Sequence, residues 1–280
     1  MVSYCLYRVA SALVSVLPRS WSARIATWIA FLFFIFKPAI RRNVRLNFER
    51  LGMSGTATFP VFKNFSHAVT DLLRLIHMNS DQMRALCTVR GTDNLDAALK
   101  KGRGAILFAP HLGPWEIGGA FISSLGYAMH TVALEHPSSR VTGFFSMMRK
   151  RWGFADYPLR SCAVGLMKAL ERGETVVLLV DRNFSHRGTR FHFLGSEVLL
   201  PDGHITLALR SGAALLPSFS YYSAEGGIQV VIGEEIPVGD RDSSNAAIGA
   251  ACLARIEECV REHPDQWFAF DHLWEEARGV

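Results

Sequence analysis

The feature that most constrains the fold is an alternation of short apolar runs with stretches of helical spacing, which begins at Gly102. The apolar runs cover Ala105–Ala109, Thr131–Leu134, Thr175–Val180, Ala214–Phe219 and Ile228–Ile232. The helical stretches lie near Trp115–Ser123, Val141–Arg151, Ala163–Arg172, His204–Ser211 and Asn245–Glu262. Alternating strands and helices are typical of α/β proteins, and strands buried on both faces read as continuous apolar runs. The sequence therefore predicts an α/β fold with a largely parallel central sheet flanked by helices.

The preceding region is expected to be helical. Between residues 57 and 100, apolar side chains such as Val61, Phe65 and Val69 recur at spacings of three and four. The chain has 280 residues, of which 49% are hydrophobic and 20% charged, so it can build a sizeable core and is not a disordered protein. Its five cysteines are an odd number with no Cys-x-x-Cys pair, which argues against a disulfide framework and favours a reducing compartment.

The N-terminal segment combines basic charge with aromatic side chains. Residues 1–50 carry eight basic groups and one acidic group, a net charge of +7, whereas residues 231–280 carry four basic and eleven acidic groups, a net charge of −7. Residues 25–36 are uncharged and include one Trp and four Phe. As a helix they would extend about 18 Å, less than the roughly 30 Å of a hydrocarbon core. We predict membrane-interface helices at residues 1–45, on an anionic phospholipid surface, and an α/β domain at 46–280.

A buried core helix explains the same apolar run equally well. A secretory signal peptide does not, because the run starts late and no small-residue cleavage site follows it before Arg41 and Arg42. Nucleic acid is excluded as a partner, since no recognised binding module is present and the basic segment is strongly apolar.

The first predicted strand end that is followed by potentially reactive side chains is Ala109. After it comes His111-Leu-Gly-Pro-Trp-Glu116. Gly113 and Pro114 suit a tight turn into a helix, so His111 would precede the helix and Glu116 would lie on its first turn. His111 is then a candidate general base, with Glu116 favouring its tautomer and imidazolium form. Amide groups at the helix N-terminus could stabilise an oxyanion. A structural His–Glu pair remains the alternative. Zinc is disfavoured, because no His-Glu-x-x-His pattern occurs.

The second strand end is Val180, followed by Asp181, Arg182 and Asn183. Arg182 and the nearby Arg187 and Arg190 suit phosphate groups on a substrate, although a structural ion pair or a solvated loop is an equal alternative. No Gly-x-Ser-x-Gly elbow and no phosphate-cradling loop with its Lys is present. Covalent serine catalysis and nucleotide hydrolysis therefore have little support.

Taken together, these blocks resemble the lipid A biosynthesis late acyltransferase (lauroyl/myristoyl acyltransferase) family, which includes the phosphatidylinositol mannoside acyltransferases. Similar blocks occur in the family's order: Arg41-Arg-Asn-Val-Arg-Leu-Asn-Phe48, Gly102-Arg-Gly-Ala-Ile-Leu-Phe-Ala-Pro-His-Leu-Gly-Pro-Trp-Glu116, Arg149, Asp181 with Phe191-His-Phe-Leu-Gly195 and Pro201-Asp-Gly203, and His263-Pro-Asp-Gln-Trp267. Pro114 stands where the family usually has Asn. Asp181-Arg182 differs from the more usual Asp-Gln and is nearer the Asp-Arg of the mannoside branch.

The resemblance implies transfer of a fatty acyl chain from a thioester, on acyl carrier protein or coenzyme A, to a hydroxyl of a glycolipid such as a lipid A precursor. It implies His111 and Glu116 as the catalytic pair, and Arg149, Asp181, Arg182 and Arg187 as substrate-binding residues. We expect Asp181 to orient Arg149 or Arg182. The thioester is a co-substrate, so no cofactor or metal is expected. The expected location is the cytoplasmic face of the bacterial inner membrane, as a peripheral or monotopic protein or through a single N-terminal anchor.

Two other functions fit the same residues. A thioesterase or lipid hydrolase would use the His–Glu pair with water as nucleophile, and a non-catalytic membrane-bound protein would only bind lipid. The retained His111, Glu116 and Asp181 speak against the second. The appearance of the acyl group on lipid or as free acid separates transfer from hydrolysis.

Overall fold

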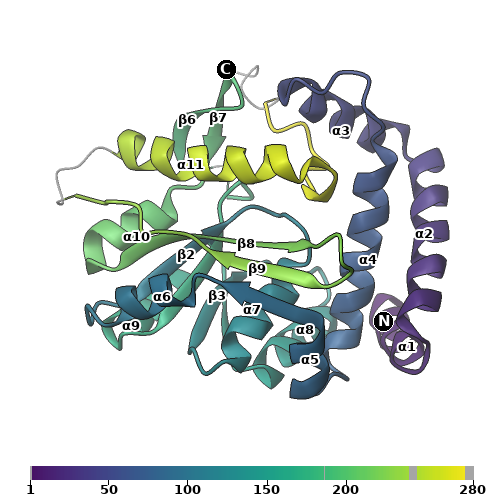
Figure 1. Cartoon of the computed structure of the whole chain (residues 1–280), viewed down its shortest axis with the longest axis horizontal. Coiled ribbons are helices and arrows are strands. Elements are labelled where there is room, and N and C mark those ends of the chain that lie inside the picture. Colours follow the sequence, from purple (N-terminus) through teal and green to yellow (C-terminus); the bar gives the residue numbers. More distant parts are fainter. Residues whose placement is uncertain (1, 186, 240–244, 275–280) are drawn as a thin grey trace.

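The computed structural model describes residues 2–185, 187–239 and 245–274 and contains a seven-stranded sheet with helices on both faces (Figure 1). The strand order is β1-β9-β8-β2-β5-β3-β4. The bounds are β1 Cys87–Arg90, β2 Ala105–Ala109, β3 Met129–Ala133, β4 Phe154–Pro158, β5 Thr175–Leu179, β8 Ala214–Tyr222 and β9 Ile228–Ile232. All neighbours pair in parallel except β8 and β9. The predicted α/β fold with a mostly parallel sheet is confirmed.

The central strand β2 is buried at every position, and its side chains alternate between two cores. Ile106 and Phe108 pack in one core, with helices α9 Cys162–Glu171, α10 Gly203–Ser211 and α11 Asn245–Glu262. Leu107 packs in the other, with α5 Ser80–Leu86, α6 Thr92–Leu99, α7 Trp115–Ser124 and α8 Ser139–Arg151. This alternation follows from the pleat of the strand, and it explains why β2 reads as an unbroken apolar run.

The sequence analysis missed the strands at the sheet edges. β1 lies within the region predicted to be helical, and β4 contains Asp156 and Pro158 with only Phe154 fully buried. An edge strand with one covered side lacks the apolar run by which the central strands were recognised. The Phe191–Gly195 block, with no predicted structure, forms a hairpin of β6 Thr189–Phe193 and β7 Ser196–Leu200 that packs on α11. A single 3-10 turn, η1, covers Pro264–Gln266.

The first four helices are α1 Val2–Val16, α2 Arg19–Phe36, α3 Pro38–Arg50 and α4 Phe59–Leu75. Figure 1 shows α2 on the outside of α4, along which it packs. The side chains that α2 buries are small ones, Ser22, Ala26 and Ala30. Most of its large apolar side chains are exposed; Trp28, for example, is 68% exposed. The alternative of an ordinary buried core helix is therefore excluded for α2.

No single helix in the described part of the chain is long and apolar enough to cross a bilayer. α2 and α3 together reach that length and composition, but they meet at a bend of 94°. The bend lies at Lys37 and Pro38, where the proline cannot supply the amide that would continue α2.

Candidate active site

The candidate site lies at the carboxyl ends of β2 and β5, which is where parallel sheets collect their chemistry. In the ladder between these strands Ala109 pairs with Leu179, and the amide of Val180 donates to the carbonyl of Ala109 at 3.0 Å. Continuing the same register brings His111 opposite Asp181. Two segments that are far apart in the chain therefore deliver their polar side chains to one point.

The Asp181 carboxylate is fully buried and accepts three hydrogen bonds. Its Oδ1 lies 2.7 Å from Nδ1 of His111, and its Oδ2 accepts from the backbone amide of His111 at 3.0 Å and from the indole Nε1 of Trp267 at 2.9 Å. Burial alone raises the pKa of Asp181, but the His111 ring and these donors outweigh burial and hold the pKa below its usual range. An ionised carboxylate can only accept, so Nδ1 of His111 carries a proton and Nε2 is the free basic nitrogen.

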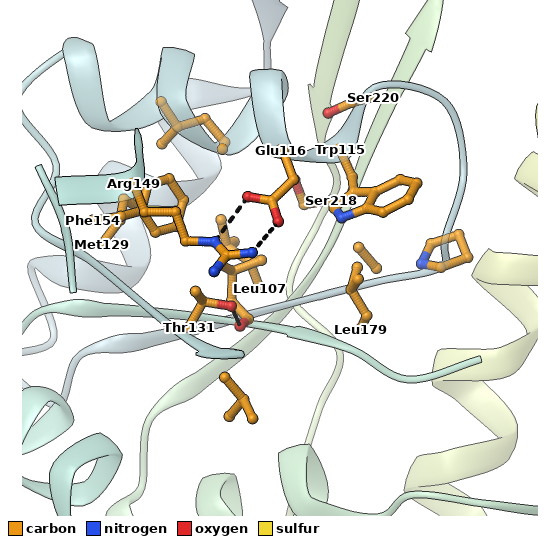
Figure 2. Close-up of a pocket in the computed structure, with 16 residues that line it drawn as sticks. Leu107, Trp115, Glu116, Met129, Thr131, Arg149, Phe154, Leu179, Ser218 and Ser220 are labelled. Atoms are coloured by element: carbon orange, nitrogen blue, oxygen red, sulfur yellow. Dashed lines mark hydrogen bonds and ion pairs between the residues drawn. The ribbon is translucent and has the colours of Figure 1, made fainter. Parts of the chain in front are cut away.

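Glu116 does not contact Nδ1 of His111, contrary to the prediction. Its carboxylate instead forms a two-point ion pair with Arg149: Nε of Arg149 donates to Oε2 at 3.0 Å, and an outer nitrogen donates to Oε1 at 2.5 Å (Figure 2). The reason is that Asp181 already occupies the position beside Nδ1, while a carboxylate on the first turn of α7 is within reach of the planar guanidinium fork on α8.

The expectation that Asp181 orients an arginine is also wrong. Arg149 is held by Glu116 and, at 3.4 Å, by Asp156, and Arg182 pairs with Asp271. Burial lowers the pKa of Arg149, but the two carboxylates outweigh burial and raise it overall. Two negative charges therefore surround one positive charge, so Arg149 has little capacity left to bind a phosphate.

A cavity of about 610 Å³ opens beside the His111–Asp181 pair. Its wall includes His111, Glu116, Arg149 and Arg182. Asp181 is outside this wall, behind His111, and the predicted substrate-binding Arg187 is exposed and is not part of it. Most of the remaining wall is apolar and includes Leu134, Leu159, Leu166, Leu178, Phe184 and Leu207. An apolar cavity of this kind with few polar groups is suited to a hydrocarbon chain that reacts at one end.

A second, much smaller cavity of about 60 Å³ also has Glu116 and Arg149 in its wall (Figure 2). Ser218, Ser220 and Thr131 contribute hydroxyl groups to its wall. Glu116 and Arg149 therefore contribute to the walls of both the large cavity and the small one.

The chain matches the model of the bacterial lipid A biosynthesis acyltransferase family over residues 1–276. It belongs to this family. The resemblance inferred from the motifs is thereby confirmed.

Several acyltransferases align with about two thirds or more of the chain. A phosphatidylinositol mannoside acyltransferase of Mycobacterium tuberculosis is 31% identical over 191 residues, which are 66% of this chain and 59% of that protein. The Mycolicibacterium smegmatis protein of the same name is 27% identical over 210 residues, 73% and 67% of the two chains. A lipid A biosynthesis palmitoleoyltransferase of Escherichia coli is 26% identical over 190 residues, 66% and 60%. The matched region thus spans about 59 to 67% of these three relatives' lengths.

The sequence reasoning found the family's C-terminal block but assigned it no part in the site. In the structure Trp267 contacts Asp181, the amide of Phe268 donates to the carbonyl of His111 at 2.8 Å, and the amide of Gly113 donates to the carbonyl of Gln266 at 2.8 Å. The block therefore holds the loop that carries His111. Its likeness to the family's Pro-x-Gln-Trp was the only signal that pointed to it.

Gly113 occupies a position that excludes other residues. Its φ is +55°, and a Cβ at this position would lie 2.2 Å from the carbonyl oxygen of Ser220. Only glycine permits this turn so close to β8. The turn lets α7 begin at Trp115, directly beside the catalytic candidate.

Proposed function

We propose that the protein is an O-acyltransferase that moves a fatty acyl chain from a thioester to a hydroxyl of a membrane glycolipid. The observation that carries the proposal is the His111–Asp181 pair at the wall of a largely apolar cavity of about 610 Å³. The His111–Asp181 pair supplies a general base, and the cavity supplies a binding site for the fatty acyl chain. Membership of the acyltransferase family supports the same reaction.

In the proposed reaction Nε2 of His111 takes the proton of the acceptor hydroxyl as its oxygen attacks the thioester carbonyl. The buried Asp181 carboxylate stabilises the imidazolium that forms. The tetrahedral intermediate collapses with cleavage of the C–S bond, and the leaving thiolate takes the proton from Nε2. The ester and the free thiol are the products, and no covalent enzyme intermediate is needed. The amide of Glu116, on the first turn of α7, is the proposed donor to the oxyanion, because the amides of Trp115 and Ile117 already donate to the carbonyls of Gly113 and Pro114.

Glu116 and Arg149 have a supporting role in this proposal. Their ion pair shapes the cavity wall next to His111, and the charge of Arg149 is already balanced by Glu116 and Asp156. Anionic groups of the substrates are better served by Arg182, which lies in the cavity wall and whose partner Asp271 is exposed to solvent, and by the exposed Arg187. The phosphates of coenzyme A, of the carrier protein's prosthetic group or of the glycolipid are suitable ligands.

We also propose that residues 1–45 attach the protein to an anionic membrane surface, at the cytoplasmic face of the bacterial inner membrane. Large apolar side chains on α1 and α2 are exposed to solvent; among them are Leu6, Val9, Val16, Trp21, Ile29 and Phe36. Eight basic residues lie in the first fifty. Apolar side chains in the acyl boundary and basic side chains on phosphates are the two components of interfacial binding.

The experiment is a transfer assay with the full chain on vesicles. Purified protein is incubated with acyl carrier protein or coenzyme A carrying an isotope-labelled acyl chain, and with a lipid A precursor or a phosphatidylinositol mannoside. Mass spectrometry then follows the label. We expect the label on glycolipid, and a loss on the order of 10²–10⁴-fold for His111→Ala. Label found as free fatty acid would indicate a hydrolase, and wild-type transfer by His111→Ala would refute the proposed base.

A further inference from the structure

We propose that Trp267 is a positioning residue of the catalytic pair, whose indole N–H fixes the Asp181 carboxylate in the orientation that keeps Nε2 of His111 free to act as a base. The inference rests on the proposed function, because it assigns a role to Trp267 only if His111 is the base. Trp267 is not part of the wall of the 610 Å³ cavity, so it would act on the substrate indirectly, through Asp181 and His111.

The first argument is the division of donors between the two carboxylate oxygens. Oδ2 of Asp181 receives both the Trp267 indole and the backbone amide of His111, which leaves Oδ1 for the imidazole. Asp181 is 0% exposed and Trp267 is 1% exposed, so bulk water does not compete for these contacts. Without the indole, Oδ2 keeps a single donor, and the orientation of the carboxylate is less firmly fixed.

The second argument is that the position of the indole is fixed by several independent contacts. Trp267 forms an isolated antiparallel bridge with Leu112, one residue after His111. The preceding Gln266 is tied to β8, since its Oε1 accepts from the amide of Tyr222 at 2.8 Å and its Nε2 donates to the carbonyl of Tyr222 at 3.0 Å. The ring of Phe193 meets the indole edge-on, with ring centroids 6.2 Å apart. The same short segment therefore places the indole and the histidine loop together.

The third argument concerns charge. A neutral N–H donor spreads the negative charge of a buried carboxylate and so weakens the hold of that carboxylate on a proton or on an imidazolium. Removing the donor concentrates the charge on Asp181, and the His111 imidazolium becomes more stable. Acyl transfer then needs a higher pH, so the acidic limb of its pH profile moves upward. A purely structural tryptophan would not move this limb.

The experiment replaces the indole N–H with sulfur by placing benzothienylalanine at position 267, which keeps the shape of the side chain. Trp267→Phe is the second variant. The matched control is Trp274→Phe: Trp274 is 4% exposed and stacks on the same Phe193 ring, but its Nε1 has no hydrogen-bond partner among the described residues. All variants are compared with wild type by melting temperature and by the pH dependence of kcat/KM for acyl transfer on vesicles.

We expect the benzothienyl variant to lose about tenfold to a hundredfold in kcat, the range for a lost hydrogen bond to a charged group, with KM for the thioester unchanged. The acidic limb of its pH profile should move to higher pH by roughly half a unit to one unit. Trp274→Phe should leave the limb in place. If the benzothienyl variant loses activity while its limb stays in place, Trp267 has only a packing role and the inference is wrong. Wild-type activity in this variant, with His111→Ala inactive, refutes it as well, whereas an active His111→Ala refutes the proposed function itself.

Discussion

Nδ1 of His111 lies 2.7 Å from Oδ1 of Asp181, and the seventy residues that separate them equal the offset between β2 and β5 in the sheet. Ala105 to Ala109 pair with Thr175 to Leu179 one by one, and the two polar side chains continue that register beyond the last ladder pair. The partner of the histidine is thus set by the alignment of two parallel strands. The helix that follows His111 instead supplies Glu116, which is committed to Arg149.

We expect Asp181→Asn to reduce acyl transfer by about 10²–10⁴-fold with little change in KM. The amide oxygen can still accept from Trp267 and from the His111 amide, which turns the NH₂ group toward Nδ1 of His111. Nδ1 must then be the acceptor, so the proton moves to Nε2 and the ring can no longer take one from the acceptor hydroxyl. Steady-state rates on vesicles measure the effect.

The control for this variant is Asp71→Asn. Asp71 is similarly buried, at 3% exposed, and accepts from Arg19 and Tyr222, away from the site. Equal losses of kcat in the two variants would show that burial of a charge, rather than the tautomer of His111, explains the result.

A thermodynamic cycle tests the coupling of Glu116 and Arg149. Arg149→Met leaves the Glu116 and Asp156 carboxylates without their shared cation, which we expect to cost about 3–5 kcal/mol of unfolding free energy. Glu116→Gln alone should cost less, since the amide oxygen still accepts from Arg149. The double variant should lose about 1–3 kcal/mol less unfolding free energy than the sum of the losses in the two single variants, as measured by urea unfolding. Additive losses would contradict direct pairing.

The buried His204 should make the folded protein less stable in acid. Burial lowers the pKa of His204 to about 4, and the nearby Asp202 offsets this only in part. The unfolded chain, with a histidine pKa near 6.5, binds a proton at higher pH than the folded chain does. Stability from this group is therefore complete above about pH 6.5 and falls as the pH drops toward 4, by up to about 3 kcal/mol. Urea unfolding of wild type and His204→Leu between pH 7 and 4 isolates the effect. Parallel pH curves would disprove it.

The exposed face of α2 predicts how the protein binds membranes. Trp28→Glu combined with Ile29→Glu should weaken binding to vesicles of phosphatidylglycerol and phosphatidylethanolamine at least a hundredfold, because both side chains are more than 60% exposed in the protein and available to the acyl boundary. High salt should weaken wild-type binding without abolishing it. Ala85→Glu, an exposed position on α5, is the matched control. Cosedimentation measures all three, and wild-type binding by the double variant would argue for another surface.

The sequence predicted the interior of the sheet better than its edges. β2 and β9 have the predicted bounds, and β2, which is buried at every position, shows an uninterrupted apolar run. β1 and β4 contain a charged residue each, Arg90 and Asp156, and show no such run. An apolar run in the sequence indicates a buried strand. The edge strands are only partly buried, so they lack one.

The site residues also differ in how far local sequence could predict them. His111 was recognisable as the residue after a buried strand and before a Gly-Pro turn. Its partner was not, because five residues in the chain made Glu116 the nearest carboxylate, while the contact with Asp181 depends on which strands become neighbours. The role of Trp267 depends on a segment more than a hundred and fifty residues away folding back over the histidine loop. No local pattern carries that information.

The place of Trp267 in the chain also determines when the enzyme can become active. α1 and α2 are translated first, and 231 residues separate Phe36 from Trp267. At roughly 5–20 residues per second, the ribosome needs on the order of 10–50 s to cover that distance. The apolar helices therefore emerge well before the donor to Asp181 has been made. Under the membrane attachment proposed above, a nascent chain would reach the bilayer before its histidine has a fixed orientation, so activity would begin only near the end of synthesis.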